Sequence, residues 1–222
     1  MEAEQISRYF LIPREQVQTI HYGVDQAFDG TDPQLFEQKF GMRNFILMVG
    51  RIEPRKNQLN LIRAARGINR PVVIIGGYVL AHKDYFDRCQ QEADSNVHFL
   101  GELPMDSEEL RSAYAACDTF VLASWFETPG LAALEAALAG AKIIITREGS
   151  TREYFKDFVE YVNPASISDI RKKIDSVLQQ PKDDRLRNYV RDHCLWEHAA
   201  SKTIDIYRKL GLQIETRKAI QN

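Results

Sequence analysis

The sequence predicts an α/β fold in which a doubly wound parallel sheet carries helices on both faces. From residue 44 onward, short apolar runs alternate with amphipathic stretches. The runs are continuous and rich in β-branched residues, as strands covered on both faces require. The stretches between them are long enough to be crossover helices. Such a fold binds its ligands beyond the carboxyl ends of the strands.

Five buried strands are expected in the central part of the chain, with helices between them. The strands are predicted within residues 44–50, 71–77, 96–101, 118–124 and 141–146. After Pro164 the sequence has an almost entirely helical pattern, and the helices are predicted over 167–179, 183–193 and 196–211. Residues 213–222 are expected to be a frayed end.

The first 25 residues do not continue this pattern. Residues 2–12 have a helical pattern, and 17–20 predict a short strand that runs into a glycine-containing turn. This αβ unit has no sheet of its own, which suggests the end of a preceding domain. We therefore expect a remnant and interdomain linker over 1–25, one binding domain over 26–195, and a C-terminal helix and tail over 196–222.

Composition disfavours several classes of function. With 29 Lys and Arg against 31 Asp and Glu, the chain lacks the basic excess of a nucleic-acid partner. The most apolar segment, 130–145, is too short for a bilayer and contains Glu135 and Lys142, so no integral membrane segment is expected. Three distant cysteines indicate neither a disulfide framework nor a zinc site. No signal peptide is recognisable, so a cytoplasmic location is expected.

Two carboxylates stand in an otherwise apolar run of small residues, 124–140. Thr128 can cap a helix whose first residue is Pro129. Glu127 then lies just before the helix and Glu135 lies on its second turn. Carboxylates accept hydrogen bonds from sugar hydroxyls, so both acids could border a sugar-bearing ligand at the helix start.

The same helix start predicts an anion site, because the N–H groups of Gly130 and Leu131 would lack acceptors. Two cations, Arg51 and Lys56, follow the first strand, before a helix expected to start near Asn57. No Gly-rich phosphate-loop motif follows that strand. A diphosphate neutralised by the two cations, with hydroxyls held by the two acids, would explain the whole set. The alternative is that the cations are solvated loop charges.

Four segments resemble the donor-binding half of the retaining GT-B glycosyltransferases of family 4, in the family's order. They are GRIEPRKNQLNLIRA (50–64), VHFLGEL (97–103), CDTFVLASWFETPGLAALEAALAGAKIIIT (117–146) and YVNP (161–164). The family's mark is two glutamates separated by seven residues, which is the spacing of Glu127 and Glu135. The resemblance covers residues 1 to about 210 and implies one Rossmann-like half of a two-domain enzyme, whose acceptor-binding domain precedes it.

By position, the resemblance implies that Arg51 and Lys56 bind the diphosphate of a nucleotide-sugar donor. It implies that Glu135 accepts hydrogen bonds from the ribose, while Glu127 faces the transferred sugar. Arg51, Lys56 and Glu127 are therefore the expected catalytic residues, and the donor is a substrate that needs no further cofactor.

The resemblance also implies that Gly130 and Leu131 offer backbone N–H groups near the phosphate. The turn from Phe99 to Gly101 is expected beside the base. The chain departs from the family in having Thr128, Pro129 and Gly130 where Gly-Phe-Gly is frequent, and Asn57 where glycine is frequent. We expect Asn57 to be tolerated as a helix cap.

The absence of an Asp-x-Asp motif predicts transfer without a metal ion. Fixed cations and a helix N-terminus can stabilise the charge that develops on a leaving phosphate. Two alternatives stay open from the residues. Glu127 and Glu135 resemble the acid pair of a glycoside hydrolase, although the cations would then be unexplained. The chain could also be a non-catalytic nucleotide-sugar binding module or partner subunit.

Overall fold

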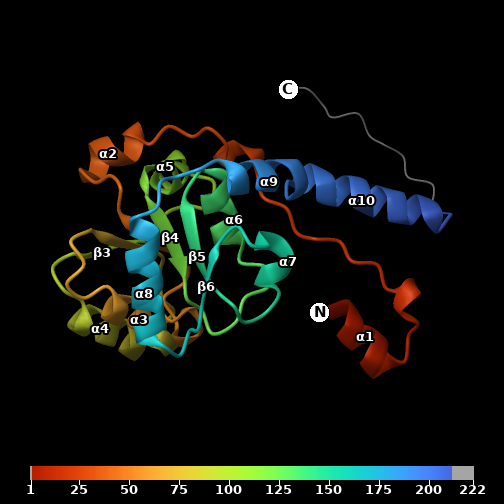
Figure 1. The fold of residues 1–222 in the computed structure, drawn as a ribbon, viewed down its shortest axis with the longest axis horizontal. Coiled ribbons are helices and arrows are strands. Elements are labelled where there is room, and N and C mark those ends of the chain that lie inside the picture. Colours follow the sequence, from red (N-terminus) through yellow and green to blue (C-terminus); the bar gives the residue numbers. More distant parts are fainter. Residues whose placement is uncertain (1, 212–222) are drawn as a thin grey trace.

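The computed structural model describes residues 2–211, and its centre is a six-stranded parallel sheet in the order β3-β2-β1-β4-β5-β6. Figure 1 shows the sheet with helices packed on both of its faces. The strands are β1 (Ile46–Val49), β2 (Val72–Ile75), β3 (Val97–Gly101), β4 (Thr119–Leu122), β5 (Lys142–Thr146) and β6 (Glu160–Val162). The chain passes to one edge through β1, β2 and β3, and to the other through β4, β5 and β6. The predicted doubly wound α/β fold is confirmed.

The five predicted strands are all present, and the side chains of β1, β2, β4 and β5 are almost wholly buried. Their continuous burial on both faces is what the unbroken apolar runs predicted. The sequence analysis missed β6, which pairs with β5 from Ile144 to Thr146. The strand is only three residues long and begins with Glu160, so no apolar run marks it.

Helices connect the strands and form the two outer layers. They are α2 (Gln34–Phe40), α3 (Gln58–Ala64), α4 (Lys83–Glu92), α5 (Glu108–Ala116), α6 (Leu131–Leu138) and α7 (Thr151–Phe155). The chain then continues through α8 (Ile167–Leu178), α9 (Arg185–His193) and α10 (Trp196–Lys209), which confirms the predicted helical C-terminal part. In one layer α3 packs on α4 and α8; in the other α5 packs on α2 and α6, and α6 packs on α9.

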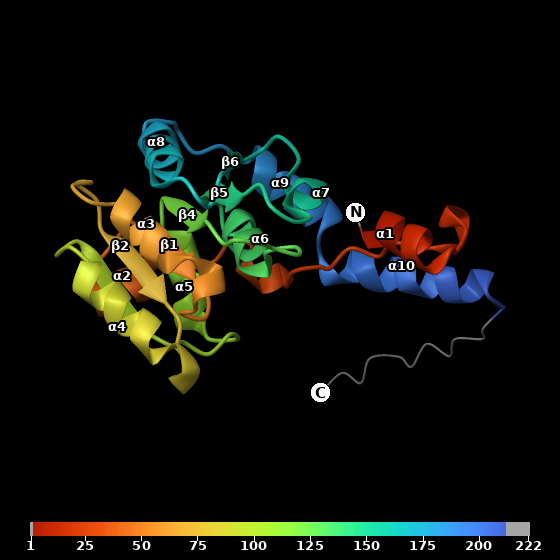
Figure 2. The ribbon, with the colours of Figure 1, turned by 90° about the horizontal axis from the view of Figure 1, so that it is seen from below.

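The N-terminal segment is only partly as expected. Helix α1 (Glu2–Phe10) is present, but residues 17–20 form no strand. A strand needs a neighbour to bond its backbone, and among residues 2–211 none lies beside this segment. In both views α1 and α10 project from the same side of the domain (Figures 1 and 2).

Contacts at residues 21–24 tie this segment to the domain, and one is a hydrogen bond from the Tyr22 N–H to the Tyr154 hydroxyl at 3.0 Å. The N–H of Val24 donates to Cys194 O at 2.8 Å, and the N–H of Trp196 donates to Val24 O at 3.2 Å. These bonds form a small backbone bridge between Val24 and Leu195. The bridge lies next to both predicted domain boundaries, after residues 25 and 195, and the boundaries stay predictions. The expected frayed end, 213–222, lies outside the described residues. No helix within residues 2–211 is both long and apolar enough to span a membrane.

Candidate functional site

A cavity of about 480 Å³ lies at the carboxyl ends of the strands. The segments that follow β1, β2, β3 and β4 all contribute to its wall, so the four turns do face one crevice. Six of the eight predicted site residues line it: Arg51, Lys56, Glu127, Gly130, Leu131 and Glu135. Phe99 and Gly101 do not.

Helix α6 begins beside the cavity, but not at the predicted residue. The sequence analysis expected Thr128 as its cap and Pro129 as its first residue, whereas the helix begins at Leu131 and Gly130 is the cap. The backbone of Gly130 is left-handed, with φ of 88°, and a residue with this backbone conformation is usually glycine. A Cβ there would also lie 3.2 Å from Ile145 Cδ1.

The N–H groups of Gly130 and Leu131 have no hydrogen-bond acceptor within the described part of the chain. They belong to a helix start that borders the cavity. Unpaired N–H groups at a helix N-terminus carry partial positive charge, so this wall attracts an anion.

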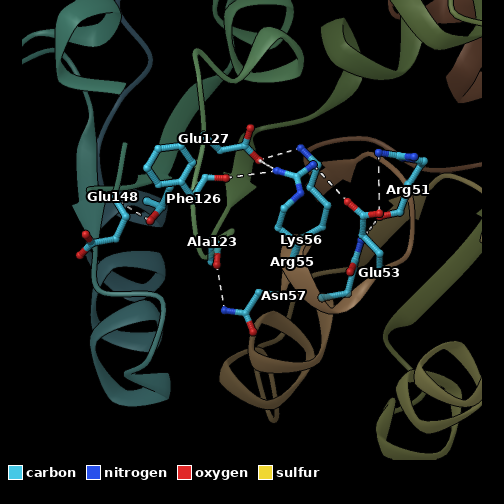
Figure 3. Close-up of polar contacts among 11 residues, drawn as sticks. Arg51, Glu53, Arg55, Lys56, Asn57, Ala123, Phe126, Glu127 and Glu148 are labelled. Atoms are coloured by element: carbon cyan, nitrogen blue, oxygen red, sulfur yellow. Dashed lines mark hydrogen bonds and ion pairs between the residues drawn. The ribbon is translucent and has the colours of Figure 1, made fainter. Parts of the chain in front are cut away.

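The closest contact in the site joins two predicted residues that were expected to bind different parts of a ligand. Lys56 Nζ donates to Glu127 Oε1 at 2.6 Å, and the two side chains are 16% and 6% exposed. Figure 3 shows the side chains of Lys56 and Arg55 converging on the Glu127 carboxylate from the loop that follows β1. Arg55 Nη1 is 3.9 Å from the same oxygen.

Arg55 and Glu53 are residues of this site that the sequence analysis did not single out. Arg55 Nη1 donates to Phe126 O at 3.2 Å, and its Nη2 lies 3.1 Å from Glu53 Oε1. The Arg55 guanidinium is not aligned for a hydrogen bond to Glu53 Oε1, so the two groups form an ion pair without a hydrogen bond. Arg51 Nη2 is 3.8 Å from the other oxygen of Glu53. The sequence signal that could have pointed to Glu53 and Arg55 is the density of charge in RIEPRK (51–56), where four of six residues are charged.

The backbone of Glu127 is held on both sides by the loop after β5. Its N–H donates to Glu148 O at 3.2 Å, and its carbonyl accepts from Ser150 N–H at 3.1 Å. Between them Gly149 has φ of 98°, and a Cβ there would lie 2.1 Å from Glu127 O. The approach of the two backbones therefore requires glycine at 149.

Glu135 lies on α6, is partly buried, and is bound by a residue that the sequence did not indicate. The Tyr114 hydroxyl donates to Glu135 Oε2 at 2.8 Å, and both residues line the cavity. Burial raises the pKa of Glu135, and the hydrogen bond from Tyr114 opposes that rise. Burial also raises the pKa of Tyr114, so its hydroxyl keeps its proton and remains a donor.

The turn after β3 contributes different residues from those expected beside a base. Phe99 packs edge-on against Phe86, with ring centroids 5.7 Å apart, and does not reach the cavity wall. Gly101 is exposed at the turn, with φ of 74°. The next residues, Glu102 and Leu103, line the cavity instead.

Within the described residues, no group of three or more His, Cys, Asp or Glu side chains is placed to hold a metal ion.

Comparison with known proteins now adds to this geometry. The profile of the family described as glycosyl transferases group 1 matches residues 32–193. An uncharacterized glycosyltransferase of Methanocaldococcus jannaschii is 28% identical over 229 residues, which cover 92% of this chain and 57% of that protein. The chain spans about half the length of the curated relatives it matches.

Solved structures share the fold. Anabaena Alr3699/HepE in complex with UDP and glucose matches with a TM-score of 0.75 at 19% identity, over 90% of this chain and 58% of that one. The C-terminal domain of a glycosyl transferase group 1 family protein, LpcC from Francisella tularensis, matches with a TM-score of 0.61 at 26% identity. That match covers 82% of this chain and 98% of the LpcC domain. The sheet is thus one Rossmann-like half of a GT-B fold, and the chain belongs to the glycosyl transferases group 1 family.

Proposed function

We propose that this chain is the donor-binding domain of a retaining, metal-independent glycosyltransferase. Its cavity would hold the nucleoside diphosphate part of a nucleotide sugar. One observation carries the proposal: cations, a helix N-terminus and two carboxylates line the same cavity at the carboxyl ends of the strands. A ligand that joins a diphosphate to hydroxyl-bearing sugars uses all of these groups.

The charges divide the cavity into two kinds of wall. Arg51 and the N–H groups of Gly130 and Leu131 suit the diphosphate, and Lys56 suits it as well if its pair with Glu127 is shared. Glu135, with its raised pKa, and Glu127 are hydrogen-bond acceptors for the ribose and the transferred sugar. As the bond to the leaving phosphate breaks, the cations and the helix start would stabilise its growing charge.

The comparisons support the donor-domain part of this proposal. Alr3699/HepE, which shares the fold, is described with UDP and glucose bound. The LpcC structure, which this chain matches almost from end to end, is described as a C-terminal domain. We therefore propose that a preceding domain supplies the acceptor site. The retaining stereochemistry and the cytoplasmic location rest on the resemblance and the sequence alone.

Isothermal titration with UDP, GDP and ADP tests the binding site. Arg51→Ala should weaken the affinity for the preferred diphosphate about tenfold or more, because a charge-assisted contact contributes about 1.5–3 kcal/mol. Arg51 is the sharper choice, since removing Lys56 would leave the buried Glu127 carboxylate without its closest partner.

Arg43→Ala is the matched control. Arg43 precedes β1, at the opposite end of the strand that Arg51 follows, and its side chain is 60% exposed against 68% for Arg51. Equal affinities for wild type and Arg51→Ala would show that the assigned phosphate site is wrong.

Metal independence is tested by repeating the titration in EDTA. We expect the affinity for the diphosphate to be unchanged within error, because Arg51 and the start of α6 supply the positive charge. A strict requirement for Mg²⁺ or Mn²⁺ would contradict the proposed mechanism.

A further inference from the structure

The ion pair between Lys56 and Glu127 would compete with the binding of a diphosphate at Lys56. A diphosphate bound at Lys56 must share an ammonium that already donates to a carboxylate at 2.6 Å. That carboxylate is itself a lining residue of the cavity, so the incoming phosphate meets a like charge at short range. The side chain of Glu127 is 6% exposed, so solvent screens this repulsion weakly.

Glu127 cannot readily move away from an incoming anion. Its backbone is bonded to Glu148 and Ser150, and glycine at 149 lets that loop press against it. On the other side Arg55 binds the carbonyl of Phe126 and lies 3.9 Å from the Glu127 carboxylate. Figure 3 shows Arg55 and Lys56 on one side of Glu127 and Glu148 on the other side, beyond Phe126. The negative charge is therefore a fixed part of the wall.

We propose that Glu127, through its pair with Lys56, makes the site select an intact nucleotide sugar over a free nucleoside diphosphate. The inference rests on the proposed function and adds a specificity to it. A free diphosphate carries more negative charge on its terminal phosphate and lacks the sugar whose hydroxyls could donate to the Glu127 carboxylate. A nucleotide sugar carries less charge there, and its sugar hydroxyls can donate to Glu127.

The same asymmetry acts after transfer. Once the sugar has left, the nucleoside diphosphate regains a terminal phosphate charge and loses the hydroxyls that satisfied Glu127. The repulsion then favours release of this product. Glu127 would thus weaken the binding of the product more than that of the donor.

The test compares two ligands on three proteins: wild type, Glu127→Gln and Glu148→Gln. Titrations use the pairs UDP and UDP-glucose, GDP and GDP-mannose, and ADP and ADP-glucose. Glutamine keeps the size of the side chain and an oxygen for Lys56 but removes the charge. We expect Glu127→Gln to bind the free diphosphate roughly tenfold more tightly, because a like-charge juxtaposition is removed. The affinity for the nucleotide sugar should stay the same or fall.

Glu148→Gln is the matched control, since Glu148 is an adjacent carboxylate that is 48% exposed and does not line the cavity. It should leave the ratio of the two affinities unchanged. If Glu127→Gln alters both affinities equally, or weakens binding of the free diphosphate, the inference is overturned while the binding site stands. If wild type binds none of the six ligands, the proposed function fails and the inference fails with it.

A second pair of variants guards against misfolding. Glu127→Asp and Glu127→Asn have the same length and differ in charge, and thermal unfolding shows whether both are folded. The Asn variant should favour the free diphosphate more than the Asp variant does. Equal ratios for the two variants would overturn the inference independently of the glutamine result.

Discussion

At the scale of single residues, Tyr114 and Glu135 form a second polar contact in the wall of the cavity. The ring of Tyr114 is fully buried and packs edge-on against Phe28, with centroids 5.5 Å apart. Its hydroxyl is the one side-chain group among residues 2–211 that donates a hydrogen bond to the Glu135 carboxylate. The pair therefore keeps a hydrogen-bond acceptor in the cavity wall at the cost of partly burying a carboxylate.

We predict that Tyr114→Phe lowers the free energy of unfolding by about 1–3 kcal/mol near neutral pH, because the buried acid loses its donor. Phenylalanine keeps the ring contacts. The measurement is urea unfolding, with Tyr207→Phe as control, since Tyr207 is exposed on α10 and its hydroxyl has no hydrogen-bond partner within residues 2–211.

The same variant has a defined pH dependence. The pKa of Glu135 is raised in the folded state, so the folded protein takes up a proton before the unfolded chain does as the pH falls. Stability lost to the buried charge is thus regained as the pH drops through the folded pKa toward the ordinary value of 4.5. Without the Tyr114 hydroxyl the folded pKa rises further. The deficit of Tyr114→Phe should therefore shrink from about pH 7.5 to about pH 5, and a deficit that grows would contradict this assignment.

At the scale of elements, Asn57 joins three segments. It is the cap of α3, as expected, but its side chain does not bind the helix N-terminus. Its Nδ2 donates instead to Ala123 O at 2.8 Å, after β4, and to Pro164 O at 2.9 Å, after β6. Its backbone is left-handed, with φ of 62°, which accounts for a position where the family often has glycine.

Two substitutions separate these contributions. Asn57→Ala should lower the free energy of unfolding by about 2–4 kcal/mol, because it strains the left-handed backbone and removes the side-chain donor to the Ala123 carbonyl. The Pro164 carbonyl would keep one donor, the Nδ2 of Asn60 at 3.0 Å. Asn57→Gly should recover about 0.5–1 kcal/mol of that loss, since glycine tolerates the backbone but supplies no donor. Chemical denaturation measures both. Equal stability of the two variants would mean that the left-handed conformation costs nothing here.

At the scale of the whole molecule, the described part of the chain consists of the sheet with its helices, the cavity at one edge of the sheet, and two helices, α1 and α10, that project from it. Helices α1 and α10 project from the same side of the domain (Figures 1 and 2), and Tyr22, between α1 and the sheet in sequence, lines the cavity. Tyr22 and Trp196 stand at this junction, half exposed, with ring centroids 6.2 Å apart. Large apolar side chains in such a position suit contact with another domain.

We predict that these 222 residues bind a nucleotide sugar but do not transfer the sugar to an acceptor. Holding donor and acceptor in attacking geometry lowers the activation free energy by on the order of 7–11 kcal/mol in favourable cases. A donor site without an acceptor site cannot provide this positioning. The measurement incubates the purified chain with the nucleotide sugar it binds best and a panel of acceptors. Multiple-turnover transfer would refute this view. Binding without transfer would also fit a non-catalytic binding module. Sugar transfer by a longer chain that includes a preceding domain would exclude that alternative.

The sequence by itself determined the class of sheet, the positions of five strands and the helical C-terminal part. These follow from local periodicity, which each segment carries without reference to its neighbours. It could not be foreseen in this way that residues 17–20 pair with no strand among residues 2–211, or that β6 is present, because pairing depends on which segments meet.

The sequence also brought Arg51, Lys56, Glu127 and Glu135 together as candidates, since the carboxyl ends of parallel strands share one edge. Only the tertiary structure decided how they are paired. Lys56 and Glu127 are 71 positions apart, and they meet because β1 and β4 are neighbours in the sheet. The donor that Tyr114 offers to Glu135 depends in the same way on how α5 packs against α6. Contacts between distant segments are set by packing, for which no local pattern of residues carries a signal.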